Sequence, residues 1–77
     1  MPTVGEQLAS AREAKKWVLE DVARLTKLRS DQVLALEEGR YHVFSAPVYV
    51  RGFVKSYAKL VNIDSAPLLE ELNGELN

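Results

Sequence analysis

Residues 19–36, with the sequence LEDVARLTKLRSDQVLAL, decide the fold of this chain. Apolar residues recur at helical spacing on both sides of a break near Lys27, which predicts two helices joined by a tight turn. Two helices that cross closely need a small side chain midway along the first, and Ala23 occupies that position. The second helix must present apolar side chains to the first, as Val33 and Leu36 do. This spacing favours a helix-turn-helix unit over a generic helical hairpin.

The first helix of this unit is expected over residues 19–26, although Val18 is a poor residue at its cap position. Another helix is expected before it, over residues 4–15. Thr3 and Glu6 form a capping box, in which each side chain accepts a hydrogen bond from the backbone of the other. The apolar residues that follow at helical spacing are Val4, Leu8 and Ala11.

The second helix of the unit is expected to begin at Ser30, a favourable capping residue, and to end at Gly39. After a connecting loop, Pro47 suits the first turn of a helix over residues 47–61. Asp64 is expected to cap a fifth helix, whose apolar residues are Leu68, Leu69 and Leu72.

A chain of 77 residues is long enough for one domain. We expect this domain to span residues 1–72 and residues 73–77 to form a frayed tail. The predicted fold class is therefore all-α, a five-helix bundle that contains a helix-turn-helix and is related to the lambda-repressor type.

The composition excludes several classes of function. The chain has no cysteine, and its single histidine, His42, has no neighbours with which to form a zinc site. No arrangement of nucleophile, base or acid indicates catalysis, so we expect neither an enzyme nor a cofactor.

The longest apolar run is residues 48–50, far short of the roughly 20 residues needed to cross a bilayer. The N-terminus lacks the features of a secretion signal, and we expect a soluble, cytoplasmic domain.

Charge is distributed unevenly along the chain, although the net charge is −1. Residues 39–59 carry four basic groups and no acidic one, whereas residues 60–77 carry four acidic groups and no basic one. A basic segment beside an acidic one predicts opposite charges on different surfaces of the domain.

The helix expected over residues 47–61 has an unusually wide apolar face. Tyr49, Phe53, Tyr57 and Leu60 fall within about 80° of one another around the helix, and three valines widen the arc to about 140°. All three aromatic residues fit a core, and Tyr57 fits it best. The width of the arc and the enrichment of aromatic residues at interfaces leave open that Tyr49 and Phe53 bind a partner, or a second copy of the chain.

Arg51, Lys55 and Lys59 form a basic stripe beside this apolar face. They are either a solvated surface or groups that steer an acidic partner. Gly52 weakens the middle of the helix, and either a close helix contact or the close approach of a partner would explain it. The predicted partner-binding residues are Tyr49, Phe53, Tyr57, Arg51 and Lys55.

The competing hypothesis is a DNA-binding regulator that places its third helix in the major groove. The residues available for DNA contacts would be Lys27, Arg29, Ser30 and Gln32. However, Asp31 and the acidic start of the second helix would repel phosphates. An isoelectric point of about 5.8 is also far from that of a typical DNA-binding domain, so we regard DNA binding as disfavoured.

Several blocks of the sequence resemble the N-terminal domain of the RodZ family. These blocks are TVGEQL at residues 3–8, LEDVA at 19–23, LEEG at 36–39 and PVYVRGFVKSYA at 47–58. The last block is the most specific, because ordinary helix-turn-helix repressors lack such a helix. The resemblance covers residues 3–72.

The resemblance implies the cytoplasmic head of a bitopic membrane protein of rod-shaped bacteria, with the bacterial actin MreB as its partner. Aromatic residues of the fourth helix contact MreB in the family, and Tyr49 and Phe53 occupy the matching positions. Lys16, Val18 and Ser45 depart from the Gly, Ser and Pro that are common there, which weakens local capping. The transmembrane and periplasmic parts of the family are not in this sequence, so we expect an excised domain or a shorter relative.

Overall fold

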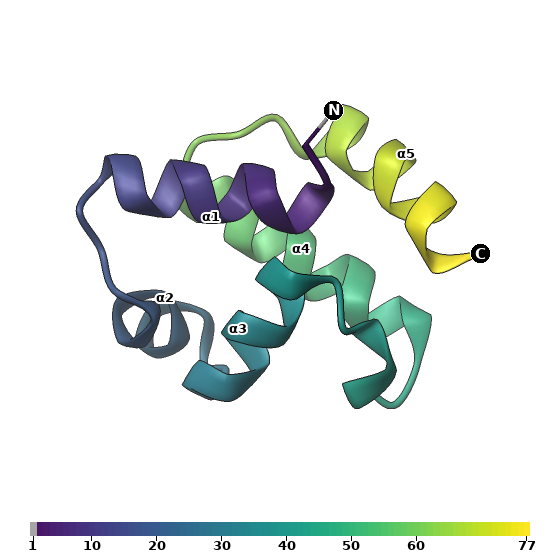
Figure 1. Ribbon diagram of the computed structural model, residues 1–77, viewed down its shortest axis with the longest axis horizontal. Helices are drawn as coiled ribbons and strands as arrows, with labels where there is room; N and C mark the ends of the chain where they lie inside the picture. Colours follow the sequence, from purple (N-terminus) through teal and green to yellow (C-terminus); the bar gives the residue numbers. More distant parts are fainter. Residues whose placement is uncertain (1) are drawn as a thin grey trace.

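The computed structural model describes residues 2–77, and these residues form five α-helices and one short 3-10 helix (Figure 1). The elements are α1 (Val4–Ala14), α2 (Leu19–Thr26), α3 (Ser30–Glu38), η1 (Tyr41–Val43), α4 (Pro47–Leu60) and α5 (Ser65–Leu76). No strand occurs in the part of the chain that the structure describes. The predicted all-α, five-helix fold is confirmed. None of these helices has the length and apolarity needed to span a membrane.

Each of the five helices packs mainly against two others, so that the contacts close a ring. α2 packs against α3 and α4, α1 packs against α3 and α5, and α4 packs against α5. Figure 1 shows α2 and α5 at opposite ends of the molecule, with α1 lying across α4. This arrangement covers one side of α4 and leaves another side of it without a neighbouring helix.

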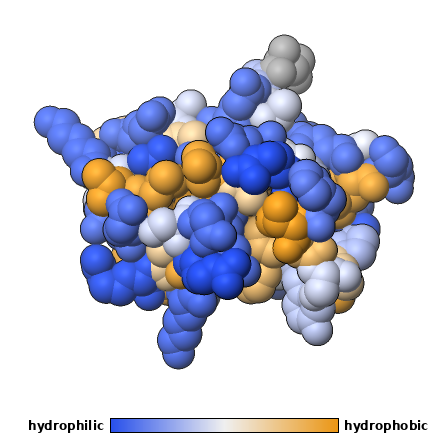
Figure 2. Space-filling model, turned by 60° about the horizontal axis from the view of Figure 1, so that its bottom comes forward, coloured by the Kyte–Doolittle hydropathy of each residue, from blue (hydrophilic) through white to orange (hydrophobic). Residues whose placement is uncertain are grey.

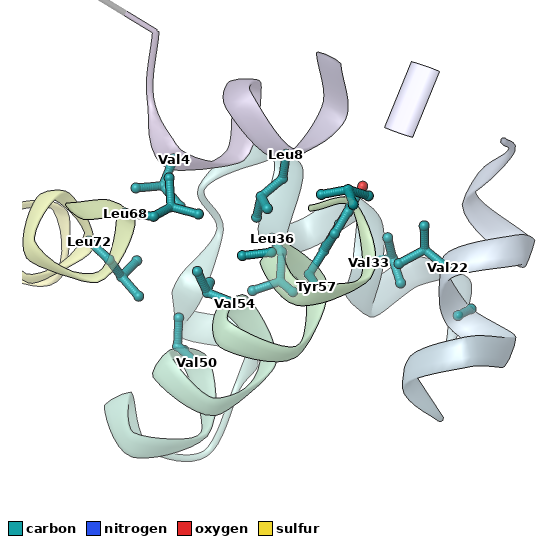
Figure 3. Close-up of a cluster of buried hydrophobic side chains, with 13 residues drawn as sticks. Val4, Leu8, Val22, Val33, Leu36, Val50, Val54, Tyr57, Leu68 and Leu72 are labelled. Atoms are coloured by element: carbon teal, nitrogen blue, oxygen red, sulfur yellow. The ribbon is translucent and has the colours of Figure 1, made fainter. Parts of the chain in front are cut away.

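All five helices contribute side chains to one core (Figure 3). Leu8 of α1, Leu36 of α3 and Tyr57 of α4 lie near its centre and are fully buried. Leu68 and Leu72 of α5 extend the core on one side. The other fully or almost fully buried apolar residues are Val4, Val22, Val33, Ala35, Val50, Val54 and Ala58. A chain this short buries a smaller fraction of its surface than a larger domain does, so most of its large apolar residues are needed for packing.

The helix starts follow the predicted caps with one exception. Thr3 and Glu6 form the expected capping box, and Asp64 accepts a hydrogen bond from the backbone N–H of Ala66. Ser30 was expected to cap α3, and this prediction was wrong, because Arg29 is the cap residue and Ser30 is already helical. The Gln32 side chain accepts a hydrogen bond from the N–H of Arg29 at 3.0 Å, which makes a serine hydroxyl unnecessary there.

Four connections between helices pass through a residue with left-handed backbone geometry. Gly39 has a φ of 74°, and Lys16, Lys27 and Asn62 have φ angles of 60°, 62° and 63°. Lys27 stands where the sequence predicted the turn between α2 and α3, so that turn is confirmed. Left-handed geometry costs a lysine roughly 1–2 kcal/mol because its Cβ approaches the following carbonyl. The packing on both sides must therefore hold the two lysines in place.

Gly5 allows α1 to lie against the backbone of α3. A Cβ atom at this position would lie 2.3 Å from the carbonyl oxygen of Glu37 and 2.5 Å from that of Leu36. These distances are far shorter than any real Cβ contact. The close approach of the two helices therefore requires glycine at position 5.

α5 extends to Leu76, four residues beyond the expected end of the helical part of the chain. The expectation of a frayed tail was wrong for this stretch, because Glu75 is held from two sides. Its carboxylate accepts a hydrogen bond from the N–H of Val4 at 2.9 Å and another from the hydroxyl of Tyr41. Burial and this contact with Glu75 raise the pKa of Tyr41 well above its usual value.

Arg12, Glu37 and Tyr57 form a largely buried polar cluster that joins α1, α3 and α4. The Arg12 guanidinium donates to both carboxylate oxygens of Glu37, at 2.8 and 3.1 Å, and to the carbonyl of Trp17 at 2.8 Å. The Tyr57 hydroxyl donates to the same carboxylate. The Arg12 pKa is raised chiefly by its hydrogen bonds to Glu37. Every member of the cluster has a partner, as a buried polar group requires.

Candidate interaction surface on α4

The wide apolar face of α4 divides into a buried edge and an outer edge. The buried edge consists of Val50, Val54, Tyr57, Ala58 and Val61. The outer edge carries Tyr49, which is 54% exposed, and Phe53, which is half-buried. The core therefore uses one edge of the face and leaves aromatic side chains on the other.

Tyr57 is one of the predicted partner-binding residues, but its buried position contradicts direct contact with a partner. Its side chain is fully buried, and its hydroxyl donates to Glu37 inside the protein. Burial, followed by the contact with Glu37, raises the Tyr57 pKa well above its usual value. Tyr57 therefore belongs to the core and positions α4 on α3.

Tyr49 and Phe53 line a shallow hollow of about 300 Å³ between α4, α3 and the loop after η1. We call this the aromatic hollow, and its lining residues are Gln32, Val43, Phe44, Ser45, Tyr49 and Phe53. The rings of Phe44 and Phe53 pack at a centroid distance of 5.5 Å and an interplanar angle of 49°, a favourable tilted arrangement. Phe53 is thus held by a neighbour of the same kind, and Tyr49 stands beside it in solvent.

Two apolar residues that the sequence analysis did not single out belong to the same surface. Val48 is 65% exposed next to Tyr49, and Val43 is 46% exposed at the edge of the hollow. The signal for Val43 in the sequence was its place beside Phe44 in the segment between α3 and α4, whereas Val48 lies in the first turn of α4. Figure 2 shows that hydrophobic residues on the displayed face form separate patches among hydrophilic ones.

Gly52 lies on the exposed side of α4, one position before Phe53. A Cβ atom at this position would meet nothing within 4 Å. The sequence left two explanations open for this glycine, a close helix contact or the approach of a partner. The described part of the chain offers no close contact, so packing does not explain the roughly 1 kcal/mol that glycine costs in a helix.

The predicted basic residues of α4 are exposed, although neither Arg51 nor Lys55 lines the aromatic hollow. The Arg51 guanidinium donates to the Asn73 side chain of α5 at 2.9 Å, and Lys55 extends into solvent. Neither residue forms an ion pair with any part of residues 2–77. Both charges are therefore available to an acidic partner.

The residues predicted for DNA contacts are arranged differently. Arg29 pairs with Asp31 at 3.1 Å, and this contact lowers the Asp31 pKa. The Gln32 side chain accepts a hydrogen bond from the N–H of Arg29 at the start of α3, and Ser30 is partly buried in the first turn of that helix. Lys27 is exposed at the left-handed turn. Two of the four candidate side chains thus already have partners within the protein.

No group of three metal-ligating side chains lies together in residues 2–77. The exposed features of the site are aromatic, aliphatic and basic groups on α4 and the neighbouring loop. Such a surface provides the chemistry of macromolecular recognition.

Residues 7–68 match the model of a family described as a helix-turn-helix domain. A membrane protein of Bacillus subtilis named YmfM is 42% identical over 53 residues, which are 69% of this chain and 18% of that protein. The cytoskeleton protein RodZ of Streptococcus pneumoniae is 31% identical over 68 residues, which are 88% of this chain and 25% of that protein. The chain therefore spans a quarter or less of these curated relatives.

A solved structure has the same fold. YmfM of Staphylococcus aureus, a membrane protein suggested to bind DNA, matches with a TM-score of 0.87 and 27% identity. The match covers 95% of this chain and 89% of that one. These findings confirm the resemblance that the sequence blocks indicated. The chain belongs to the helix-turn-helix domain family, as a RodZ-like member.

Proposed function

We propose that this domain is a non-enzymatic interaction module that binds the bacterial actin MreB through α4, at the cytoplasmic face of the membrane, in cell-shape maintenance. The observation that carries the proposal is the exposure of Tyr49 beside the half-buried Phe53 on the free side of α4. The similarity to a relative named as a cytoskeleton protein supports a partner of this kind.

The aromatic hollow has the composition of a binding hot spot. Tyrosine is enriched at hot spots because a rigid ring buries a large area and loses little conformational entropy. Tyr49 is free to insert into a partner, and Phe53 offers an apolar floor that Phe44 already orients. Gly52 lies about one turn after Tyr49 and leaves the helix backbone uncovered there, so a partner can approach closely.

The unpaired basic residues of α4 favour an acidic partner. Arg51 and Lys55 lie on the same helix as Tyr49 and Phe53, within a segment that contains no acidic residue. Unpaired cations at the rim of an interface accelerate association and contribute less to final affinity. We therefore expect the aromatic residues to set the dissociation rate and the basic residues to set the association rate and its salt dependence.

The test is a fluorescence-polarisation titration of the labelled domain with purified MreB. Tyr49→Ala and Phe53→Ala are expected to weaken binding by roughly 30-fold or more each, the effect of losing a hot-spot residue. Val18→Ala is the matched control, because Val18 is 57% exposed and lies at the start of α2. Circular dichroism of each variant must show an unchanged fold. Equal binding by the wild type and both aromatic variants would overturn the proposal.

DNA binding is the second candidate function, since a structural relative has been suggested to bind DNA. A duplex DNA titration at several salt concentrations tests it in parallel. Tight, sequence-selective binding that is lost in Arg29→Ala and Gln32→Ala would favour this function and place the site on α3. Weak binding that disappears with added salt would leave α4 as the functional surface.

A further inference from the structure

A second hollow lies between the C-terminal ends of α2 and α4 and takes no part in the proposed function. We call it the α2–α4 cleft, and its lining residues are Leu25, Thr26, Lys27, Ser56, Lys59 and Leu60. Its volume is about 480 Å³, larger than that of the aromatic hollow. It shares no lining residue with that hollow.

The cleft combines an apolar surface with two positive charges. Leu25 is 51% exposed and Leu60 is half-buried, so the two leucines leave apolar surface open to solvent. Lys27 and Lys59 are exposed on the two helices that form the cleft. Neither lysine forms an ion pair within residues 2–77.

The position of Lys27 adds a specific observation. It adopts left-handed geometry with a φ of 62°, a position at which glycine or asparagine would be less strained. Its charge lies at the C-terminus of α2, where the helix dipole favours a cation, and it also gives the cleft a positive group. The Thr26 hydroxyl donates to the carbonyl of Val22 at 2.6 Å, so the two lysines and Ser56 are the side chains left to donate to a ligand.

We propose that the α2–α4 cleft binds a short acidic segment of a partner protein that carries a large aliphatic side chain. The aliphatic side chain packs between Leu25 and Leu60, and a neighbouring carboxylate accepts hydrogen bonds from Lys27 and Lys59. The cleft can bind such a segment whichever macromolecule binds the aromatic hollow, because the two sites share no lining residue.

The size of the cleft indicates a short segment rather than a folded partner. A stable interface between folded proteins uses roughly 20–30 residues on each side, and the cleft has six lining residues. Ser56 and Lys59 lie seven and ten positions after Tyr49, so the cleft begins roughly 10–15 Å along α4 from that residue. One partner can therefore occupy the aromatic hollow with a folded surface and the cleft with a loop or tail.

Shape and chemistry distinguish this occupant from a membrane or a nucleic acid. A flat bilayer would touch the rim of a concave site and leave the leucines of its floor uncovered. A nucleic acid backbone would satisfy the lysines and gain nothing from the exposed Leu25. An acidic segment with an aliphatic residue uses both halves of the cleft.

The test is a titration of the isotope-labelled 77-residue chain, monitored by NMR through its backbone amide chemical shifts. The probe is a blocked hexapeptide of glutamate and leucine. We expect the largest shifts at the six cleft residues. Binding is expected to be at least about tenfold weaker for an analogue with glutamine in place of glutamate, and likewise for one with alanine in place of leucine. Lys59→Glu and Leu25→Ala are each expected to weaken binding to a similar degree, and both sites are exposed enough to leave the fold intact.

Lys15→Glu is the control, because it makes the same charge change at an exposed site at the end of α1, outside the cleft. Shifts centred elsewhere, or no shifts, would overturn the proposal. Equal binding of the alanine analogue would also overturn it, since charge alone would then explain the contact. Vesicles of anionic lipid and a duplex DNA are titrated in parallel. If either shifts the cleft residues more strongly than the peptide does, the cleft is a lipid or phosphate site instead.

Discussion

Gly5 and Gly52 offer a matched test of the packing described above, because the same substitution should have opposite effects at the two positions. At Gly5 a Cβ atom would lie 2.3 Å from a carbonyl oxygen of α3, whereas ordinary contact begins at 3.4 Å. α1 must therefore move away from α3 by about 1 Å, and the core side chains that face it must follow. At Gly52 the new methyl group meets nothing within 4 Å.

Gly5→Ala is expected to lower the free energy of unfolding by about 2 kcal/mol, since overpacking a tight contact costs about 1–3 kcal/mol. Gly52→Ala is expected to raise it by about 1 kcal/mol, the difference in helix propensity between the two residues. In a domain of this size, each kcal/mol corresponds to about 4–8 °C in Tm.

Thermal and urea unfolding followed by far-UV circular dichroism measure both values. The reasoning would be refuted if Gly5→Ala were as stable as the wild type, or if Gly52→Ala were destabilised. A Gly52→Ala variant that is more stable but binds MreB more weakly would show that the glycine serves the interface.

Three further substitutions test particular contacts. Tyr57→Phe removes a hydrogen bond to the Glu37 carboxylate and should cost about 1.5–3 kcal/mol in chemical denaturation. Because the Tyr57 pKa is raised, its neutral hydroxyl stabilises the fold below the ordinary value of 10.0, and this stability is lost as the pH rises above it. Tyr57→Phe should therefore flatten the alkaline part of the stability–pH curve, and an unchanged slope would contradict this assignment. Lys16→Gly should raise the unfolding free energy by about 0.5–1 kcal/mol, because glycine relieves the left-handed backbone, and a lower Tm would argue against strain there. Glu75→Ala should speed hydrogen exchange at the amide of Val4, and unchanged protection would mean that the Glu75 contact does not hold the helix end.

The helix boundaries could be predicted from the sequence because they depend on local chemistry. Thr3, Asp64, Gly39 and Pro47 each act on backbone groups within a few residues, and all four mark the ends found in the structure. The end of α5 could not be predicted in this way. It depends on a contact between Glu75 and Val4, which are 71 positions apart.

Only part of the candidate site could be predicted from the sequence, because the rest depends on contacts between distant parts of the chain. Tyr49 and Tyr57 lie about 80° apart around α4, and helical periodicity places both on one apolar arc. Periodicity does not tell which edge of an arc faces the core. That choice depends on where α2 and α5 pack against α4, and on the buried Glu37 carboxylate, which pairs with Arg12 and accepts a hydrogen bond from the Tyr57 hydroxyl.

The contact between Glu75 and Val4 also bears on how the chain folds as it is synthesised. Val4 provides one of the N–H groups at the start of α1 that have no partner within their own helix, and its side chain packs in the core beside Leu68 and Leu72. Within this domain, the first helix in chain order is therefore completed by the fifth. The apolar face of α1 stays partly uncovered until α5 has also emerged from the ribosome, so this domain completes its native core only when all five helices are available.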